Sequence, residues 1–119
     1  MPTGMSLRSF GSATSRNARV FGAGSLGAAV LYMVIENFRG GDAVPVYRRF
    51  RDKGRLAPDG LKYVASWVTE DLRRCFQIME CDDPALLTQW MSHWEDLTEF
   101  EVVPVVTSAD AVTAVAPRL

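Results

Sequence analysis

The sequence predicts an α+β domain of the ferredoxin-like type, with elements in the order β-α-β-β-α-β. Two observations lead to this fold class. Short runs rich in β-branched and aromatic residues alternate with two segments of helical periodicity. Right-handed crossovers then give an antiparallel four-stranded sheet in the order 4-1-3-2, with both helices on one face. The predicted domain spans residues 30–107, and a chain of 119 residues has the length of one domain.

The first half of the domain is predicted to contain a strand, a helix and a second strand. Residues 31–38 (LYMVIENF) read as a strand that two glycines end. A helix over residues 43–53 follows, with Asp42 as its N-cap. A turn rich in Pro, Asp and Gly leads to the second strand, residues 61–69. The apolar stripe of the helix is Val46, Tyr47 and Phe50.

The second half repeats this arrangement. Residues 74–81 (RCFQIMEC) form the third predicted strand. Asp83 and Pro84 are the start signal of a helix whose apolar residues recur at helical spacing through Glu95. Residues 99–107 form the fourth strand, which the predicted order places at an edge of the sheet. A proline at position 104 fits an edge strand, because proline cannot donate to a central ladder.

The segments on either side of the domain look different. Residues 1–29 are rich in Ser, Gly, Ala and Arg and bury too little to offset the entropy of ordering, so we expect a disordered arm or a mis-set gene start. The run Gly22–Gly27 matches G-x-G-x-x-G, but it lacks the preceding strand and the βαβ unit of a dinucleotide site. We therefore interpret it as a chance match. Residues 108–119 are predicted to be a tail with about one helical turn.

Charge and cysteine usage restrict the function classes. The basic residues of the first 35 positions have no acidic counterpart, whereas residues 36–119 hold ten basic and fourteen acidic residues. An acidic folded part argues against nucleic-acid binding. The apolar stretch at residues 28–35 is far shorter than the roughly 20 residues that span a membrane. Cys75 and Cys81 lie in one predicted strand, roughly 20 Å apart, so we expect free thiols in a cytoplasmic protein.

The strands predict a partner. Residues 32–35 (YMVI) and 102–106 (VVPVV) are apolar on both faces, although an antiparallel sheet with one wet face should alternate. Two helices cover only one face. We expect the other face to pack on a second copy, as in dimeric α+β barrels. The alternative is a monomer with an exposed apolar patch, which monomeric soluble proteins seldom carry.

Residues 31–107 resemble a bacterial family catalogued as domain of unknown function 3303. The runs RCFQIMECDDPALL and FEVVPV carry the most specific part of this resemblance. It implies a small ferredoxin-like protein of unassigned activity, with no catalytic residues to transfer to this chain.

Few groups offer catalytic chemistry. His93 is the only histidine, and we interpret it as a partly exposed structural residue rather than a general base. No set of three metal ligands is recognisable, so no metal or cofactor is expected. Glu36 and Glu80 lie in strands but at opposite ends of the sheet, which excludes a paired-carboxylate site. A salt bridge from Glu36 to Arg73 or Arg74 is expected.

The candidate ligand site combines aromatic residues with a single amide. The residues expected to line it are Tyr63, Trp67, Cys75 and Gln77, with His93 nearby; Met79 has the same parity. Such a mixture is typical of a small-ligand pocket with one polar anchor, and equally of a filled core.

Three hypotheses follow: a non-catalytic homodimeric module that binds a small, mostly apolar ligand between sheet and helices, a cofactor-independent enzyme of the small monooxygenase or isomerase type, and a structural or partner-binding domain. A cavity touching Trp67 and Gln77 without a titratable group would favour binding. A cavity reached by His93 or a strand glutamate would favour catalysis, and a filled core the third hypothesis.

Overall fold

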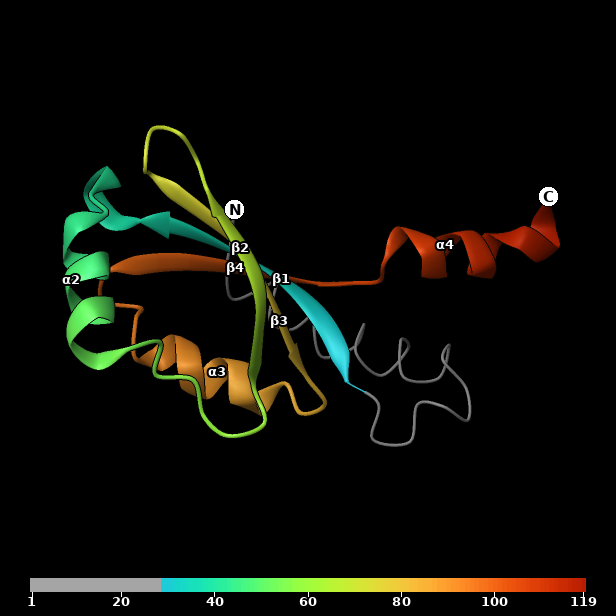
Figure 1. Ribbon diagram of the computed structural model, residues 1–119, viewed down its shortest axis with the longest axis horizontal. Helices are drawn as coiled ribbons and strands as arrows, with labels where there is room; N and C mark the ends of the chain where they lie inside the picture. Colours follow the sequence, from blue (N-terminus) through green and yellow to red (C-terminus); the bar gives the residue numbers. More distant parts are fainter. Residues whose placement is uncertain (1–28) are drawn as a thin grey trace.

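Four strands form one antiparallel sheet in the order β2-β3-β1-β4 in the computed structural model, which describes residues 29–119 (Figure 1). The strands are β1 (Val30–Phe38), β2 (Lys62–Val68), β3 (Arg74–Cys81) and β4 (Thr98–Val105). This is the predicted order, and the ferredoxin-like α+β fold is confirmed. Pro104 lies in β4, an edge strand, as its missing N–H requires.

Two helices connect the strands at the positions predicted. They are α2 (Val44–Lys53), which follows a short 3-10 turn η2 (Arg39–Gly41), and α3 (Ala85–Ser92). The expected aspartates bond the first turn of each helix: Oδ1 of Asp42 accepts from the Val44 amide, and Oδ1 of Asp83 from the Ala85 amide, both at 3.0 Å. Helix α3 ends at Ser92, earlier than the predicted Glu95, because the chain continues in tighter turns.

The sheet has one face covered by helices and one face open. In β1 the even-numbered residues, from Val30 to Phe38, are buried, and the odd-numbered residues between them are only half-buried. The same alternation runs through β3, where Cys75, Gln77, Met79 and Cys81 are buried. Figure 1 shows α3 running beneath the sheet and α2 lying across the end where β1 finishes. Both helices therefore cover the face on which the even-numbered residues of β1 lie.

A β-bulge in β2 changes which residues of that strand face the helices. Tyr63 pairs with Met79, but after the bulge Ser66 pairs with Gln77 and Trp67 with Phe76. Directly paired residues of antiparallel strands share a face, so the extra residue moves Trp67 to the open face. The expectation that Trp67 shares a face with Gln77 is wrong for this reason.

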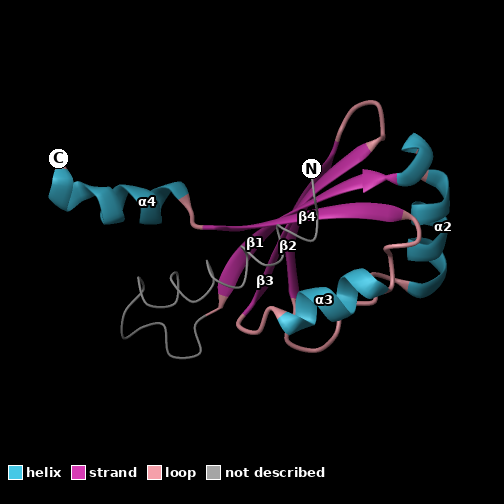
Figure 2. Ribbon diagram, turned by 180° about the vertical axis from the view of Figure 1, so that it is seen from behind, coloured by secondary structure: helices cyan, strands magenta, loops and turns pink. Residues whose placement is uncertain are grey.

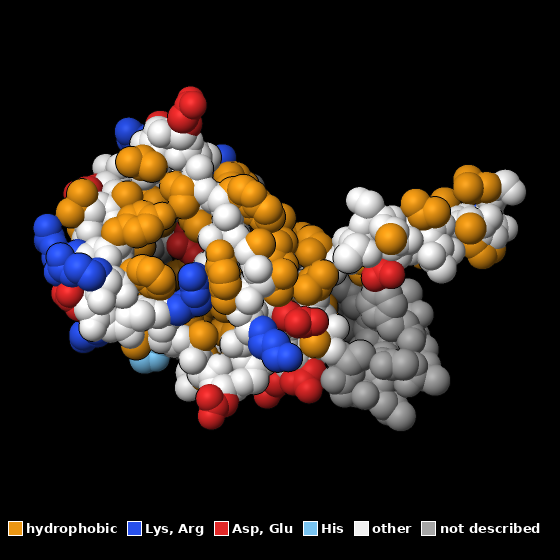
Figure 3. Space-filling view, in the orientation of Figure 1, with side chains coloured by type: hydrophobic (Ala, Val, Ile, Leu, Met, Phe, Trp, Pro, Cys, Tyr) orange, Lys and Arg blue, Asp and Glu red, His pale blue; other side chains and the backbone are white. Residues whose placement is uncertain are grey.

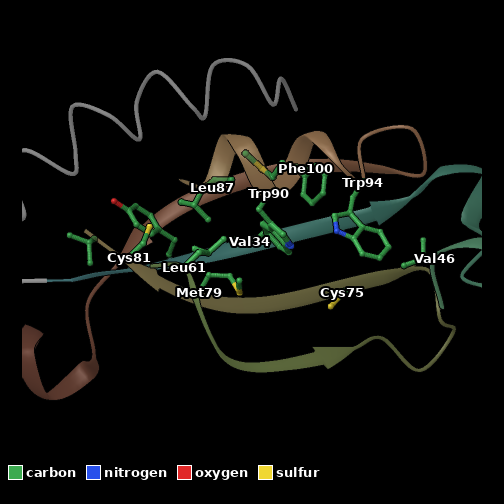
Figure 4. Packing of buried hydrophobic residues seen from close by; sticks show 14 of the residues in the cluster. Val34, Val46, Leu61, Cys75, Met79, Cys81, Leu87, Trp90, Trp94 and Phe100 are labelled. Carbon is green, nitrogen blue, oxygen red and sulfur yellow. The ribbon is translucent and has the colours of Figure 1, made fainter. Parts of the chain in front are cut away.

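The core lies between α3 and the sheet. Leu87 is fully buried, and the Trp90 ring packs against the Phe100 ring at 5.9 Å. Figure 4 shows Leu87 and Trp90 of α3, and Trp94 from the turn after it, extending toward the strands, with Val46 of α2 beside Trp94. The large apolar side chains of α3 thus fix its position over β1 and β4.

The C-terminal tail contains more helix than the single turn expected. Helix α4 (Ser108–Val115) is followed by the 3-10 turn η3 (Ala116–Arg118), and Oγ1 of Thr107 caps α4 by accepting from the Asp110 amide at 3.0 Å. Figures 1 and 2 show α4 extending away from the sheet beyond the end of β4. All residues of α4 are exposed.

Two expectations concern residues that the structure does not describe. The disordered arm or mis-set start proposed for residues 1–29 lies almost entirely outside residues 29–119, and the Gly22–Gly27 run lies wholly outside them. Across residues 29–119, no helix has both the length and the apolar character needed to cross a bilayer.

Replacing Leu87 by alanine is expected to lower the free energy of unfolding by about 2–5 kcal/mol, because it empties a fully buried site in α3. Chemical denaturation at one fixed protein concentration measures this loss. The matched control is Leu72→Ala, which shortens the same kind of side chain at a position 56% exposed, and should change stability by less than about 0.5 kcal/mol. Equal losses in the two variants would contradict the packing described for α3.

Candidate functional site

An open cavity lies between the helix-covered face of the sheet, α2 and α3. Its volume is about 120 Å³. The polar side chains that line it carry a carboxyl, a guanidinium, an amide, a hydroxyl, a thiol and a phenol group. Figure 3 shows an opening ringed by hydrophobic side chains, with an acidic side chain visible inside and a basic one beside it. The lining residues are Glu36, Phe38, Val46, Tyr47, Phe50, Arg55, Ser66, Cys75, Gln77, Trp90 and Trp94.

Glu36 lies on the helix-covered face, in the interior strand β1 and two residues before its end. Its partners in register are Cys75 on β3 and Phe100 on β4, and only 9% of its surface is exposed. Directly paired residues project from the same face, so the carboxyl is surrounded mainly by apolar groups and a thiol. A carboxyl group in such surroundings needs hydrogen-bond partners to offset its desolvation.

Gln77 and Arg55 supply those partners as a chain of two hydrogen bonds. Nη1 of Arg55 donates to Oε1 of Gln77 at 2.5 Å, and Nε2 of Gln77 donates to Oε2 of Glu36 at 3.1 Å. Arginine has only donors, so it fixes the orientation of the amide, and the amide nitrogen must then face the carboxyl. Among the described residues, Oε1 of Glu36 accepts no hydrogen bond, which leaves this oxygen available to a ligand.

The loop that carries Arg55 is held on several sides. The carbonyl oxygen of Arg55 accepts from the indole N–H groups of Trp90 and Trp94, each at 3.0 Å. Its guanidinium carbon lies 3.8 Å from the centre of the Tyr63 ring and 5.2 Å from that of Phe50. These contacts fix the guanidinium at the cavity.

The backbone on both sides of Arg55 has positive φ. Gly54 has φ +75° and Leu56 has φ +64°. Leucine rarely adopts the left-handed region, so the contacts of this loop outweigh a cost on the order of 1 kcal/mol or more at Leu56. Strain of this kind gathers at sites where a side chain must be held in one place.

Burial changes the acidity of two groups in the cavity. Burial raises the pKa of Glu36 to about 7, and the positive charge of Arg55 opposes this shift without cancelling it. Burial, and then the nearby Glu36 charge, raise the pKa of Cys75 to about 12, so its thiol stays protonated and is a poor nucleophile. The carboxyl is therefore the group in the cavity that exchanges a proton near neutral pH.

The structure brings only part of the predicted site together. Cys75 and Gln77 line the cavity, and Tyr63 stands at its border, stacked on Arg55 and bonded through its hydroxyl to Ser66 at 2.8 Å. Trp67 is 61% exposed on the other face because of the bulge. His93 is exposed at the end of α3, where its carbonyl oxygen accepts from Arg49 and its backbone N–H donates to the Trp90 carbonyl.

The salt bridge expected between Glu36 and Arg73 or Arg74 is absent among the described residues. The strand register explains the error. Arg74 pairs with Asn37, whose side chain is on the open face, and the Arg74 guanidinium stacks on the ring of Phe76. Glu80 pairs with Leu31 and Lys62, so it shares their face and stays away from the cavity. The sequence analysis thus left Glu36 out of the expected ligand site, although a strand glutamate was considered for catalysis, and it missed Arg55 altogether. The signal that could have identified Glu36 is its position as a lone carboxylate within an apolar strand. No sequence signal identified Arg55.

Both cysteines are free, as expected, and both are buried. Within residues 29–119 no group of three or more His, Cys, Asp or Glu side chains is arranged to hold a metal ion.

The buried carboxyl predicts a pH-dependent stability. The pKa of Glu36 is about 7 in the folded protein against an ordinary value of 4.5, so between these values the folded state keeps a proton that the unfolded chain releases. Stability present below pH 4.5 is therefore lost as the pH rises toward 7, by about 3 kcal/mol. Denaturant unfolding from pH 4.5 to 8 measures the loss.

Two variants test the assignment. Glu36→Gln should remove most of this pH dependence. Glu80→Gln, which alters a strand carboxyl on the open face, should retain it. A Glu36→Gln profile that follows the wild-type profile would show that Glu36 ionises normally.

Comparison with known proteins gives one result. No curated protein and no solved structure matches the chain significantly. The family described as Domain of unknown function (DUF3303) matches residues 30–119, which is well over half of the chain and includes α4. The four-stranded domain, its cavity and its C-terminal helix all lie within this match, and the chain belongs to this family.

Proposed function

We propose that this protein binds a small, mostly apolar molecule with one polar group in the cavity between sheet and helices, and that it does so as a homodimer. The cavity itself carries the proposal. Aromatic side chains from α2 and α3 form its walls, and three polar groups from β1, β3 and the loop after α2 converge within it. This is the composition of small-molecule sites.

The size of the cavity limits the ligand. A cavity of about 150 Å³ is known to hold benzene. At about 120 Å³, with one side open to solvent, this cavity suits a single ring or a branched chain of similar size. The polar group of the ligand would meet Oε1 of Glu36 or the guanidinium of Arg55, so a carbonyl or hydroxyl group fits best.

The open face of the sheet supports the dimer. Its centre is Met33, which lies between Val103 on β4 and Ile78 on β3. The apolar residues of this face come from all four strands: Leu31, Met33, Ile35, Ala65, Trp67, Phe76, Ile78, Val103 and Val105. A second copy would bury this surface, with Trp67 as a large exposed anchor of the kind that dominates interfaces.

Helix α4 adds a second argument for the dimer. An isolated helix of eight residues is not stable in water, so α4 needs a packing surface. It leaves the domain and exposes Val112, Val115 and, beyond it, Leu119. A neighbouring copy would provide that surface. We place the dimer in the cytoplasm, where free thiols such as Cys75 and Cys81 persist.

Ligand binding can be read from tryptophan fluorescence. The chain has three tryptophans, and two of them, Trp90 and Trp94, line the cavity. In a Trp67→Phe variant, all tryptophan emission comes from these two residues. Addition of cyclohexanone should change that emission until the cavity is saturated. Ser66→Leu should weaken this response about ten-fold, or ~1.4 kcal/mol, by filling the cavity. Ala65→Leu, the adjacent change on the open face, should not. A linear, non-saturating response in the protein that retains Ser66 would contradict the binding proposal.

The dimer is tested by native mass spectrometry of the purified protein at micromolar concentration, which also detects a retained ligand. A dimer mass is expected for the wild type. Met33→Lys places a charge at the centre of the open face and should shift the mass to monomer, whereas Val44→Lys, on the exposed side of α2, should leave the dimer intact. A monomeric wild type would exclude the dimer.

A further inference from the structure

We infer that the cavity is a proton-transfer site for small carbonyl compounds, in which Glu36 takes a proton from the carbon next to the carbonyl and Arg55 binds the carbonyl oxygen. This inference rests on the proposed binding function and assigns a substrate class and a reaction to the same cavity. It starts from three facts: a carboxyl with one oxygen unengaged within the described residues, a guanidinium held beside it, and an apolar cavity of single-ring size.

The bonds and electrons of the step balance without a further reactant. The C–H bond next to the carbonyl breaks, and its proton goes to the Glu36 carboxylate. The electron pair forms a carbon–carbon double bond, while the carbonyl π pair moves to the oxygen as an enolate. If Glu36 first swaps this proton with solvent, its return to the same carbon gives isotope exchange, and return to the far end of a conjugated enolate moves the double bond.

Each residue has a distinct part in this step. Glu36 is the base, because it is the carboxyl group that lines the cavity. Arg55 stabilises the enolate oxygen, since only one of its donor groups is engaged by Gln77 and the others remain for a substrate. Gln77 is a positioning residue that fixes the carboxyl through Oε2 and leaves Oε1 toward the ligand.

The surroundings of Glu36 suit a base that works near neutral pH. The titratable groups around it are Tyr47 from α2, Cys75 from β3 and Arg55 from the loop, with pKa values of Tyr47 and Cys75 both raised. Helix α3, the turn after it and β4 present the uncharged rings of Trp90, Trp94 and Phe100. Tyr47 and Cys75 thus stay neutral while Glu36 titrates, and the base works best when its pKa lies close to the working pH.

The loop at Arg55 agrees with a catalytic assignment. The two indole hydrogen bonds fix the Arg55 backbone, and the amide of Gln77 and the ring of Tyr63 hold its guanidinium before a substrate arrives. Donors that are already oriented stabilise a developing negative charge without reorganisation.

The probe for the test is 3-cyclohexen-1-one, a single ring with one ketone. Wild-type protein in D₂O should exchange the protons between the carbonyl and the double bond, followed by NMR, and should form the conjugated isomer, followed by absorbance. Glu36→Gln should lower both rates by about 100-fold or more. Glu36→Asp should restore part of the activity. Glu80→Gln, which changes a carboxyl on the opposite face, should leave both rates unchanged.

Two further readouts separate chemistry from structure. The wild-type rate should rise with a midpoint near pH 7, as Glu36 loses its proton. Gln77→Met removes a donor to the carboxylate and should raise this midpoint, whereas a purely structural role would leave it in place. Arg55→Lys should retain more activity than Arg55→Met.

The outcomes distinguish the two proposals. Saturable binding of the probe with equal exchange rates in wild type and Glu36→Gln would overturn proton transfer and leave the binding function intact. Absence of saturable binding, with cyclohexanone and with this probe, would overturn both. If Glu36→Gln binds the probe as the wild type does but has lost exchange, the assignment stands.

Discussion

The hydrogen-bonded chain from Arg55 through Gln77 to Glu36 is the constraint on which the rest of the site depends. It places a carboxyl on the helix-covered face, where apolar packing alone would leave the charge unpaired. Forming the chain requires the loop after α2 to reach the sheet, and the indoles of Trp90 and Trp94 hold that loop by its backbone. The position of α3, the path of the loop and the state of the carboxyl are therefore coupled, and the cavity lies where the three meet.

Alternation along the strands separates two tasks. On β1 and β3 the even positions of one strand and the odd positions of the other face the helices and build the cavity, and the intervening residues form the open apolar face. A ligand in the cavity and a partner on the open face would thus use different side chains of the same strands. The bulge in β2 adjusts this division, since it assigns Ser66 to the cavity and Trp67 to the open face.

The sequence was sufficient for the elements and the sheet order, because hydrophobic period, capping aspartates and prolines are local signals. It was insufficient for the site. One extra residue in β2 reversed the face of Trp67, and no residue type in that strand marked the bulge. The partner of Glu36 was misjudged because it depends on register, which placed Cys75 opposite it and Arg74 one residue further along. Arg55 could not be found, because its role comes from loop contacts with residues 22 to 39 positions away.

The departures from local rules gather at one place. Over most of the described chain, residue preference and fold agree: apolar residues fill the face that α3 covers, and an aspartate accepts from the first amide of each connecting helix. At the cavity they disagree, with a carboxyl among buried side chains and a leucine at positive φ beside Arg55. Leu72, the other leucine at positive φ, lies in the β2–β3 turn, where a tight reversal accounts for it. Turn geometry does not require a buried glutamate, and packing would favour an apolar residue there. The proposed proton transfer needs a carboxyl at that position and would account for the cost of burying Glu36.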